Sequence, residues 1–195
     1  MARRQDPTRG PRAAMIDGAI TLMRERGVAA TSFAEVLSRS GAPRGSVYHH
    51  FPNGKSQLIE EATTSASKWV GTGIDRILDA SDTVGALRAL VDIWRSGLES
   101  SRYEQGCPIA AAALGTERGA RIIAGTSFDS WCAVLATKLI GEGVPEERAG
   151  SIAVLIVSSL EGALILAQAQ ESSAPLDAVV DELELLCRSA VHPAT

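Results

Sequence analysis

Side chains suited to contacting a DNA groove are concentrated between residues 44 and 55. They comprise an Arg, a small pair, three rings with polar edges and a Lys: Arg44, Gly45, Ser46, Tyr48, His49, His50 and Lys55. An Arg can donate two hydrogen bonds to the edge of a guanine, whereas the other polar groups suit phosphates or thymine methyl groups. The small residues beside the Arg would allow the backbone to approach the bases. The stretch therefore predicts contact with double-stranded DNA.

A short helix is predicted immediately before this stretch, over residues 32–40. Ser32 can cap its first turn, and Glu35, three residues later, would complete a capping box. Phe33, Val36 and Leu37 follow the i, i+3, i+4 spacing of a buried stripe. The pattern predicts a helix that packs one face against the rest of a small domain.

A second helix is predicted to follow across a tight turn. Gly41 can adopt the left-handed conformation that ends a helix, and Pro43 suits the first turn of the next one. Val47 and Phe51 then lie one above the other and should face inward, which leaves the polar residues outside. Two helices joined in this way form a helix-turn-helix, whose second helix enters the major groove. A plain helical hairpin with a solvated basic end is the alternative that the pattern leaves open.

The combined motif resembles the TetR family of one-component transcriptional repressors. The matching positions are Thr31-Ser32, Ser40-Gly41-Ala42-Pro43, Gly45, Tyr48-His49-His50-Phe51, Lys55 and Leu58. The chain departs from the family pattern at Ala42-Pro43, where Val-Ser is usual, and by one extra residue before Lys55. The resemblance implies a homodimeric repressor that binds a palindromic operator, with Thr31 and Ser32 as lesser phosphate contacts.

A later motif narrows this resemblance. Residues 41–55, together with Gly106-Cys107-Pro108, resemble a subgroup whose known members respond to lincomycin-type antibiotics or flavonoids. The resemblance implies a small hydrophobic effector that enters the C-terminal domain, shifts the helix starting near Lys55 and releases the operator. A constitutive DNA-binding protein without an effector is the main alternative.

Composition predicts an all-α protein with unevenly distributed charge. Hydrophobic residues make up 45% of the 195 residues but aromatic residues only 4%, and no segment alternates with period two. The first 56 residues hold nine basic and four acidic side chains, a net charge of +5. Because the whole chain has a formal net charge of −4, residues 57–195 carry a net charge of −9. A positive module on an acidic body is typical of a protein that binds nucleic acid through one end.

Three segments are predicted along the chain. Residues 1–10 should form a basic disordered arm, residues 11–72 a helix-turn-helix DNA-binding domain, and residues 73–195 a helical ligand-binding and dimerisation domain. Outside the helix-turn-helix, Gly and Pro punctuation predicts helices over residues 11–26, 55–69, 74–78, 83–101, 108–114, 117–140, 146–170 and 176–191.

Catalysis is the principal rival function, and the sequence argues against it. Cys107 could act as a nucleophile at a helix N-terminus, but the three His residues lie at 49, 50 and 192, so none in the body is available as its base. The three Cys are widely spaced and predict neither a zinc site nor a disulfide framework, and we expect no cofactor. The N-terminus lacks the apolar core of a secretory signal, and the apolar run 152–167 contains several polar residues, so we expect a cytoplasmic protein without a membrane span.

The acidic C-terminal segment, residues 73–195, has few aromatic side chains, and these lie between residues 94 and 131. The candidate effector contacts are Trp94, Tyr103, Phe128 and Trp131, with Cys107 near the entrance. Drug-sized ligands bind mostly apolar pockets, although core packing is the alternative for each ring taken singly. No cationic cluster lies in the apolar segments, so a flat neutral or cationic molecule is expected rather than an anion, which would need a buried Arg or Lys.

Two long apolar segments, 152–167 and 176–186, exceed what one small helical domain needs to bury. We expect them to pack as an isologous four-helix interface between two subunits. The candidate interface residues are Leu155, Ser158, Ser159, Gly162, Leu166, Val179 and Leu183. Glu161 should face either the partner or the effector cavity, and the sequence leaves both open.

Overall fold

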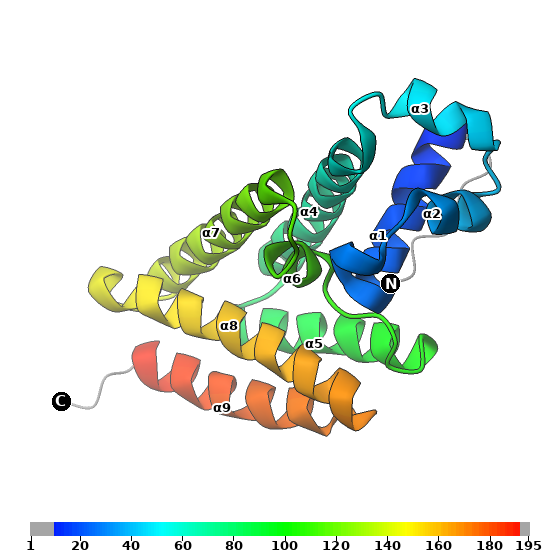
Figure 1. The fold of residues 1–195 in the computed structure, drawn as a ribbon. Coiled ribbons are helices and arrows are strands. Elements are labelled where there is room, and N and C mark those ends of the chain that lie inside the picture. Colours follow the sequence, from blue (N-terminus) through cyan, green and yellow to red (C-terminus); the bar gives the residue numbers. More distant parts are fainter. Residues whose placement is uncertain (1–9, 192–195) are drawn as a thin grey trace. The chain divides into compact units, whose positions relative to one another are not determined.

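The computed structural model describes residues 10–191, apart from the side chain of Arg44, and throughout that range the regular structure is helical. This confirms the all-α prediction (Figure 1). The elements are α1 (Gly10–Ala30), α2 (Phe33–Ser40), η1 (Arg44–Ser46), α3 (Val47–His50), α4 (Gly54–Ala80), α5 (Thr83–Ser100), α6 (Pro108–Ala113), α7 (Arg118–Gly141), α8 (Glu146–Gln170) and α9 (Ala174–Val191). Residues 1–9 of the expected arm lie outside the described residues, and Gly10 already begins α1.

The first helix of the helix-turn-helix begins and ends as its sequence predicts. Ser32 accepts a hydrogen bond from the backbone N–H of Glu35, and the Glu35 carboxylate accepts from the backbone N–H of Ser32, which completes the capping box. The Ser32 hydroxyl and backbone N–H, followed by Arg26, hold the pKa of Glu35 below its usual value. Because the pKa of Glu35 is depressed in the folded state, its carboxylate stabilises the fold at pH values above the unfolded-state pKa. This stabilisation is lost as the pH falls through the folded-state pKa. Gly41 ends α2 in the left-handed conformation, with φ 67°.

Two helices extend more than two residues beyond their predicted bounds. Helix α4 was predicted to end near residue 69, with a separate helix at 74–78, but it continues through Gly71 and Gly73 as one 27-residue helix. Two glycines within two turns did not break it, since tertiary packing routinely overrides helix propensity. Helix α1 does leave helical geometry at the predicted stop, Gly27, where φ is 76° and ψ is 174°, but a further turn follows to Ala30.

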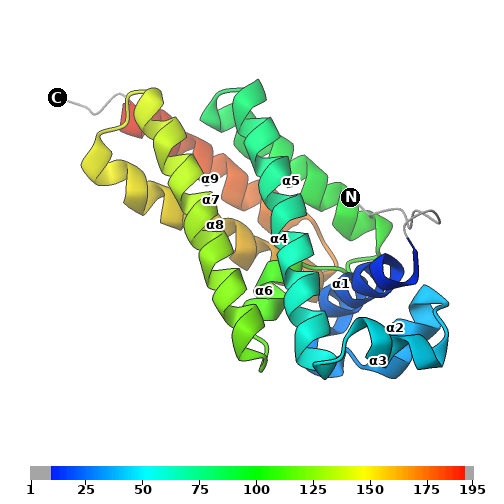
Figure 2. The same ribbon diagram turned by 90° about the horizontal axis from the view of Figure 1, so that it is seen from above.

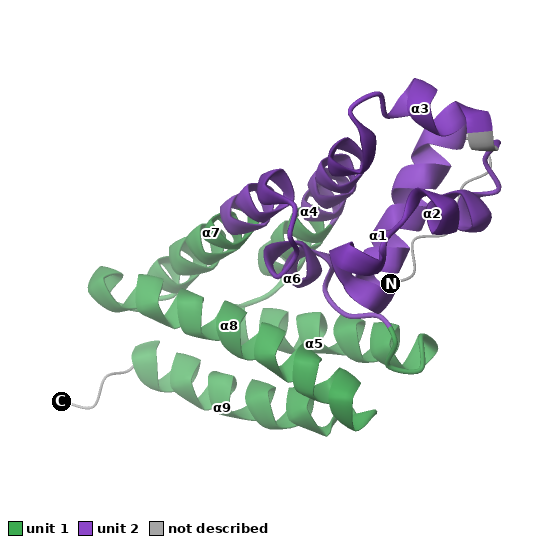
Figure 3. Cartoon of the chain, viewed as in Figure 1, with its two compact units in different colours: residues 1, 70–104, 127–195 green, residues 2–69, 105–126 purple. Residues whose placement is uncertain are grey.

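The described chain forms two compact units (Figure 3). One contains residues 10–69 and 105–126, and the other contains residues 70–104 and 127–191. The first division lies close to the domain boundary expected at residue 72. The grouping of residues 105–126 with the N-terminal residues was not expected, because it depends on contacts between segments about 80 residues apart.

The N-terminal unit packs α1 against both α2 and α6. Its core includes Met15, Met23, Phe51, Leu58 and Ile59, whose side chains are almost completely excluded from solvent. These residues come from α1, from α4 and from the end of α3. Burial of such large apolar side chains provides most of the stability of a small helical unit and holds α3 in a fixed orientation.

The second unit packs α9 against both α5 and α8, and α8 and α9 run side by side (Figure 2). Leu87, Leu98, Ile156, Leu164 and Leu176 form the centre of its core. Ion pairs join α5 to α9 at the surface: Arg88 contacts the largely buried Glu184, and Arg95 contacts Asp177.

Candidate nucleic-acid interface

The buried side of α3 determines which of its residues remain outside. Val47 and Phe51 are buried as the sequence predicts. Their burial leaves Gly45 and His49 exposed, Tyr48 70% exposed and His50 partly exposed. The candidate groove-contacting residues therefore share one accessible face. The side chain of Arg44 lies outside the described residues, so its role stays a prediction.

The segment that leads into α3 is tighter than an ordinary helix. Pro43 precedes the first turn instead of occupying it, because residues 44–46 form a 3₁₀ turn before the four-residue α3. The Ser46 hydroxyl donates a hydrogen bond of 2.6 Å to the carbonyl of Pro43. Pro43 fixes φ at −61°, which restricts the backbone at the start of this element.

Lys55 lies in the first turn of α4 and connects it to the end of α1. Its Nζ donates a hydrogen bond of 3.2 Å to the carbonyl of Ala29. A cation at a helix N-terminus opposes the helix dipole, and the Ala29 carbonyl partly offsets that cost. The side chain is not fully buried, so its ammonium group keeps donors for a phosphate.

The two lesser candidates already have hydrogen-bonding partners within the chain. Thr31 is only 1% exposed, and its hydroxyl donates to the carbonyl of Gly27 at 3.0 Å, so its role as a phosphate contact stays a prediction for which this hydroxyl would have to leave Gly27. Its hydroxyl satisfies a backbone carbonyl at the kink of α1. Ser32 is exposed, but its hydroxyl is engaged with Glu35 in the cap.

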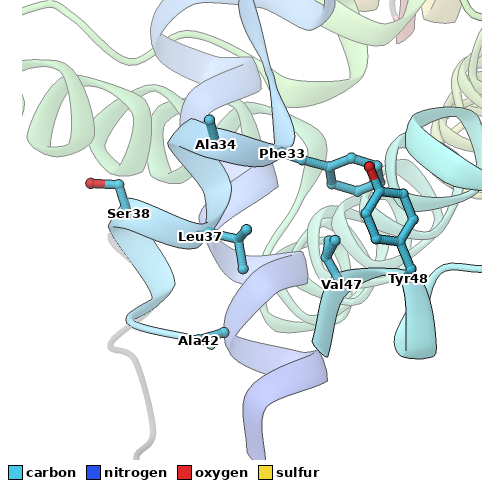
Figure 4. A pocket seen from close by; sticks show the side chains of 7 residues that line it. All are labelled: Phe33, Ala34, Leu37, Ser38, Ala42, Val47 and Tyr48. Atoms are coloured by element: carbon cyan, nitrogen blue, oxygen red, sulfur yellow. The ribbon is translucent and has the colours of Figure 1, made fainter. Parts of the chain in front are cut away.

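A hollow of about 520 Å³, with a lining more apolar than polar, opens between α2 and α3 (Figure 4). Its lining consists of Phe33, Ala34, Leu37, Ser38, Ala42, Val47 and Tyr48. The rings of Phe33 and Tyr48 meet edge to face, with centroids 6.0 Å apart, at one end of it. The sequence pattern of Phe33, Leu37 and Val47 predicted only buried core residues, not this surface. The sequence signal for this hollow was the pair of small residues Ala34 and Ser38, which are four residues apart and so lie on one exposed face of α2.

A buried polar network, also missed from the sequence, ties the segment before α6 to α1. The Arg24 Nε donates to the carbonyl of Gly106 at 2.9 Å, and the N–H of Gly106 donates to the carbonyl of Arg24 at 3.1 Å. Burial lowers the pKa of Arg24, while electrostatic interaction with Cys107 and Glu25 acts in the opposite direction. Arg24 therefore has a structural partner inside the N-terminal unit.

The network continues to α2 through a shared carboxylate. Glu25 accepts a hydrogen bond of 3.1 Å from Gln105 and two from Arg39, at 2.9 and 2.7 Å. Arg39 belongs to the first helix of the helix-turn-helix. Residues 105 and 106 are therefore linked through α1 to the element that supports α3.

Comparison with known proteins assigns this architecture. Residues 15–62 match a family model described as bacterial regulatory proteins, tetR family, and residues 83–182 match one described as transcriptional regulator LmrA/YxaF-like, C-terminal domain. An HTH-type transcriptional regulator of Mycobacterium tuberculosis is 42% identical over 185 residues, covering 91% of this chain and 94% of that protein. The chain belongs to the TetR family.

Other members of the TetR family support the same assignment. The HTH-type transcriptional regulator YxaF of Bacillus subtilis is 33% identical over 181 residues, which cover 91% of this chain and 95% of that protein. The crystal structure of a TetR transcriptional regulator from Legionella pneumophila has the same fold, with a TM-score of 0.82 at 18% identity, covering 93% of this chain and 99% of that one. The chain is thus a transcriptional regulator with a DNA-binding helix-turn-helix.

In the second unit of this TetR-family regulator, two of the expected effector-binding rings meet. Phe128 and Trp131 stand edge to face with centroids 5.3 Å apart, and Trp131 is 5% exposed. A Cβ added at Gly71 would lie 3.6 Å from the indole Nε1, so the glycine leaves space beside that nitrogen. Trp94 and Tyr103 are partly exposed and make no ring contact with this pair within the described part of the chain.

Cys107 and Tyr103, the two residues expected near the entrance of the effector pocket, lie in different surroundings. Cys107 is buried at the N-cap of α6 and groups with the N-terminal unit, not with the rings. Tyr103 has a positive φ of 61°, and its carbonyl accepts a hydrogen bond from Gln168. Among residues 10–191 no group of three or more His, Cys, Asp or Glu side chains is arranged to hold a metal ion.

Helix α8 exposes an apolar face. Val154, Leu155, Ile165 and Leu166 are each about half exposed, and a Cβ at Gly162 would meet nothing within 4 Å. By length and composition α8 could cross a membrane, and within residues 10–191 it is the one helix of which this is true, a property shared by core helices of soluble proteins.

The remaining expected interface residues divide between surface and core. Ser158 is exposed, whereas Ser159, Val179 and Glu161 are partly exposed. Leu183 is only 4% exposed and packs inside the subunit, so its contact with a partner stays a prediction. The exposed leucine of α9 is Leu185, two residues later and on the opposite side of the helix.

Proposed function

We propose that the protein is a ligand-responsive repressor that binds a palindromic operator as a homodimer and is released by a small hydrophobic molecule. The observation that carries the proposal is the accessible polar face of α3, held by buried Val47 and Phe51, in a chain of the TetR family. Gly45, Ser46, Tyr48, His49 and His50 would contact the major groove and its phosphates, together with Arg44.

The exposed face of α8 supports the proposed dimer. Leu155, Ser158, Gly162 and Leu166 recur every three or four residues and so share one side of the helix. Packed against the same face of a second copy, with α9 alongside, they would form the four-helix interface. A two-fold axis there would present two copies of α3 to the two halves of an inverted repeat.

Two features of the chain support effector-dependent release. Helix α4 begins beside Lys55 and is unbroken to Ala80, so a displacement of one end is transmitted to the other. Residues 105 and 106 are hydrogen-bonded to α1 through Arg24 and Glu25. An effector need only bind the released conformation better than the DNA-bound one to shift the equilibrium.

The DNA-binding part of the proposal is tested with Lys55→Ala. Selection from random duplexes with the full chain should return an inverted repeat, and the variant should bind that operator and unrelated DNA more weakly by similar factors, because a phosphate contact carries no sequence information. The slope of log K against log salt should fall in magnitude by about 1.

The control is Lys68→Ala, which removes the same charge farther along α4 and should leave the slope unchanged. A Lys55→Ala variant that keeps the wild-type slope would show that this ammonium group does not lie on a phosphate.

The effector part is tested with Trp131→Phe. A panel of planar neutral and cationic aromatic compounds, with carboxylated analogues as controls, should contain neutral or cationic molecules that quench Trp fluorescence and weaken operator binding. The operator should weaken effector binding by the same factor, since coupling is reciprocal. The variant keeps a ring but loses the indole N–H, so affinity should fall by roughly 2- to 10-fold, the value of one hydrogen bond.

Two results would contradict the effector proposal. Compounds that bind the protein tightly but leave its operator affinity unchanged would favour a constitutive DNA-binding protein. Unaltered affinity in both Trp131→Phe and Trp131→Ala would move the pocket away from this side chain.

A further inference from the structure

We infer that the hollow between α2 and α3 receives the methyl group of a thymine and thereby selects thymine at one position of each half-site. The inference rests on the proposed placement of α3 in the major groove. It assigns a specificity determinant to a surface lined by both α2 and α3, whereas the sequence predicted base contacts only from residues 44–55.

The position of the hollow places it against DNA. It is lined by the accessible face of α2, through Ala34 and Ser38, and by Tyr48 of α3. In a helix-turn-helix the second helix lies in the major groove while the first crosses the backbone. A surface between the two therefore meets the edge of the groove, where base edges adjoin their own sugar–phosphate strand.

The chemistry of the hollow selects its occupant. Ala34, Leu37, Ala42 and Val47 contribute aliphatic side chains to the lining, and Phe33 and Tyr48 close one end with their rings. Among the groups that bases expose in the major groove, the C5 methyl of thymine is the apolar one, and the others are hydrogen-bond donors or acceptors. A methyl group would gain apolar contact with these side chains, and both uracil and cytosine lack it at C5, so both should bind more weakly than thymine.

The rim of the hollow is polar and would hold the adjacent strand. Ser38 is exposed and Tyr48 is 70% exposed, so both hydroxyl groups are available to a phosphate. Phosphate contacts set the position of the protein, and the aliphatic side chains of the hollow then read one base. The carbon atoms of a deoxyribose are the competing occupant, and they do not distinguish thymine from uracil.

The test uses the full chain and an operator obtained by selection from random duplexes. Each thymine is replaced singly by uracil, which removes the methyl group and keeps every base-pair hydrogen bond. We expect the Kd to rise about four-fold at one thymine in each half-site, the effect of one buried methyl group. Sequence-specific binding that is unchanged by uracil at every position would overturn the inference and leave the proposed repressor function standing.

A filling variant locates the methyl group. In Ala34→Leu the added carbons occupy the hollow, and an exposed α2 position accommodates Leu with little change in helix propensity. This variant should bind the thymine and uracil operators equally, whereas Ala133→Leu, at an exposed position of α7, should keep the four-fold ratio. Retention of the ratio in Ala34→Leu would place the methyl contact elsewhere. Loss of affinity in Ala34→Leu without any uracil effect in the wild type would identify a sugar as the occupant and refute the inference.

Discussion

A Leu166→Asp variant should sediment as a monomer and lose operator affinity by about 100-fold or more. Leu166 is half exposed on α8, and in the proposed interface each copy of the new carboxylate would be buried without a partner. An uncompensated buried charge costs about 3–5 kcal/mol, and the two-fold axis doubles the number of such charges. A monomer engages one half-site and forgoes the gain from bivalent binding. Sedimentation equilibrium and an operator titration measure the two effects.

A second substitution separates loss of the dimer from loss of the fold. Gly162→Leu should also dissociate the dimer, because a Cβ there meets nothing within the subunit but would meet a closely approaching partner helix. Since Gly is a poor helix former, the monomer should become more resistant to unfolding, not less. The control is Leu114→Asp, at an exposed position of α6's C-terminal end in the N-terminal unit, which should stay dimeric. A Gly162→Leu protein that remains dimeric would remove α8 from the interface.

A Phe51→Ala variant should lose about 3–5 kcal/mol of stability in the N-terminal unit, together with operator binding. The ring is completely buried directly after α3, and the Arg12 guanidinium lies 5.3 Å from its centroid. Its removal leaves a cavity beneath α3 and takes away the ring over which the Arg12 guanidinium lies. Urea denaturation measures the stability, and far-UV circular dichroism shows whether helix is lost.

Tyr48→Ala provides the contrast for this prediction. The Tyr48 side chain is 70% exposed, so its removal should change stability by less than about 0.5 kcal/mol while still weakening operator binding. Phe51→Ala acting only on DNA affinity, at unchanged stability, would show that the ring contacts DNA and is not a support for α3.

Local signals in the sequence predicted the helix-turn-helix accurately because its turns depend on neighbouring residues. The Ser32–Glu35 capping box and the left-handed Gly41 each need only three or four consecutive residues to form. The burial of Val47 and Phe51 likewise follows from their spacing on one short helix. For such residues, the neighbouring sequence is sufficient to predict the local structure.

The features that the sequence did not predict depend on distant partners. Gly71 and Gly73 suggested a helix break, yet α4 continues through them, and Gly71 faces the indole of Trp131. Leu183 belongs to an apolar stripe whose pattern cannot distinguish the inner from the outer side of α9. Thr31 has a polar side chain at a position that suits phosphate contact, but its hydroxyl bonds to the kink at Gly27.

The candidate site shows the same division. The exposed residues of α3 were predicted from one helical face, whereas the hollow requires α2 and α3 to be placed side by side. The Arg24–Gly106 hydrogen bonds join residues 82 positions apart, and no local pattern reveals such a pair.

The participation of residues 105–126 in the N-terminal unit affects which part of the gene can be exchanged between regulators. A crossover at residue 72 would transfer Arg24 without Gly106, and Val28 without Gly115, where a Cβ would come within 2.9 Å of the valine side chain. Chimeric regulators assembled at that point would join mismatched surfaces, and a foreign side chain larger than glycine at position 115 would collide with α1. The unit that can be exchanged as a whole therefore consists of two separate segments, residues 10–69 and 105–126. Recombination within this family should favour crossovers that take both segments from one parent.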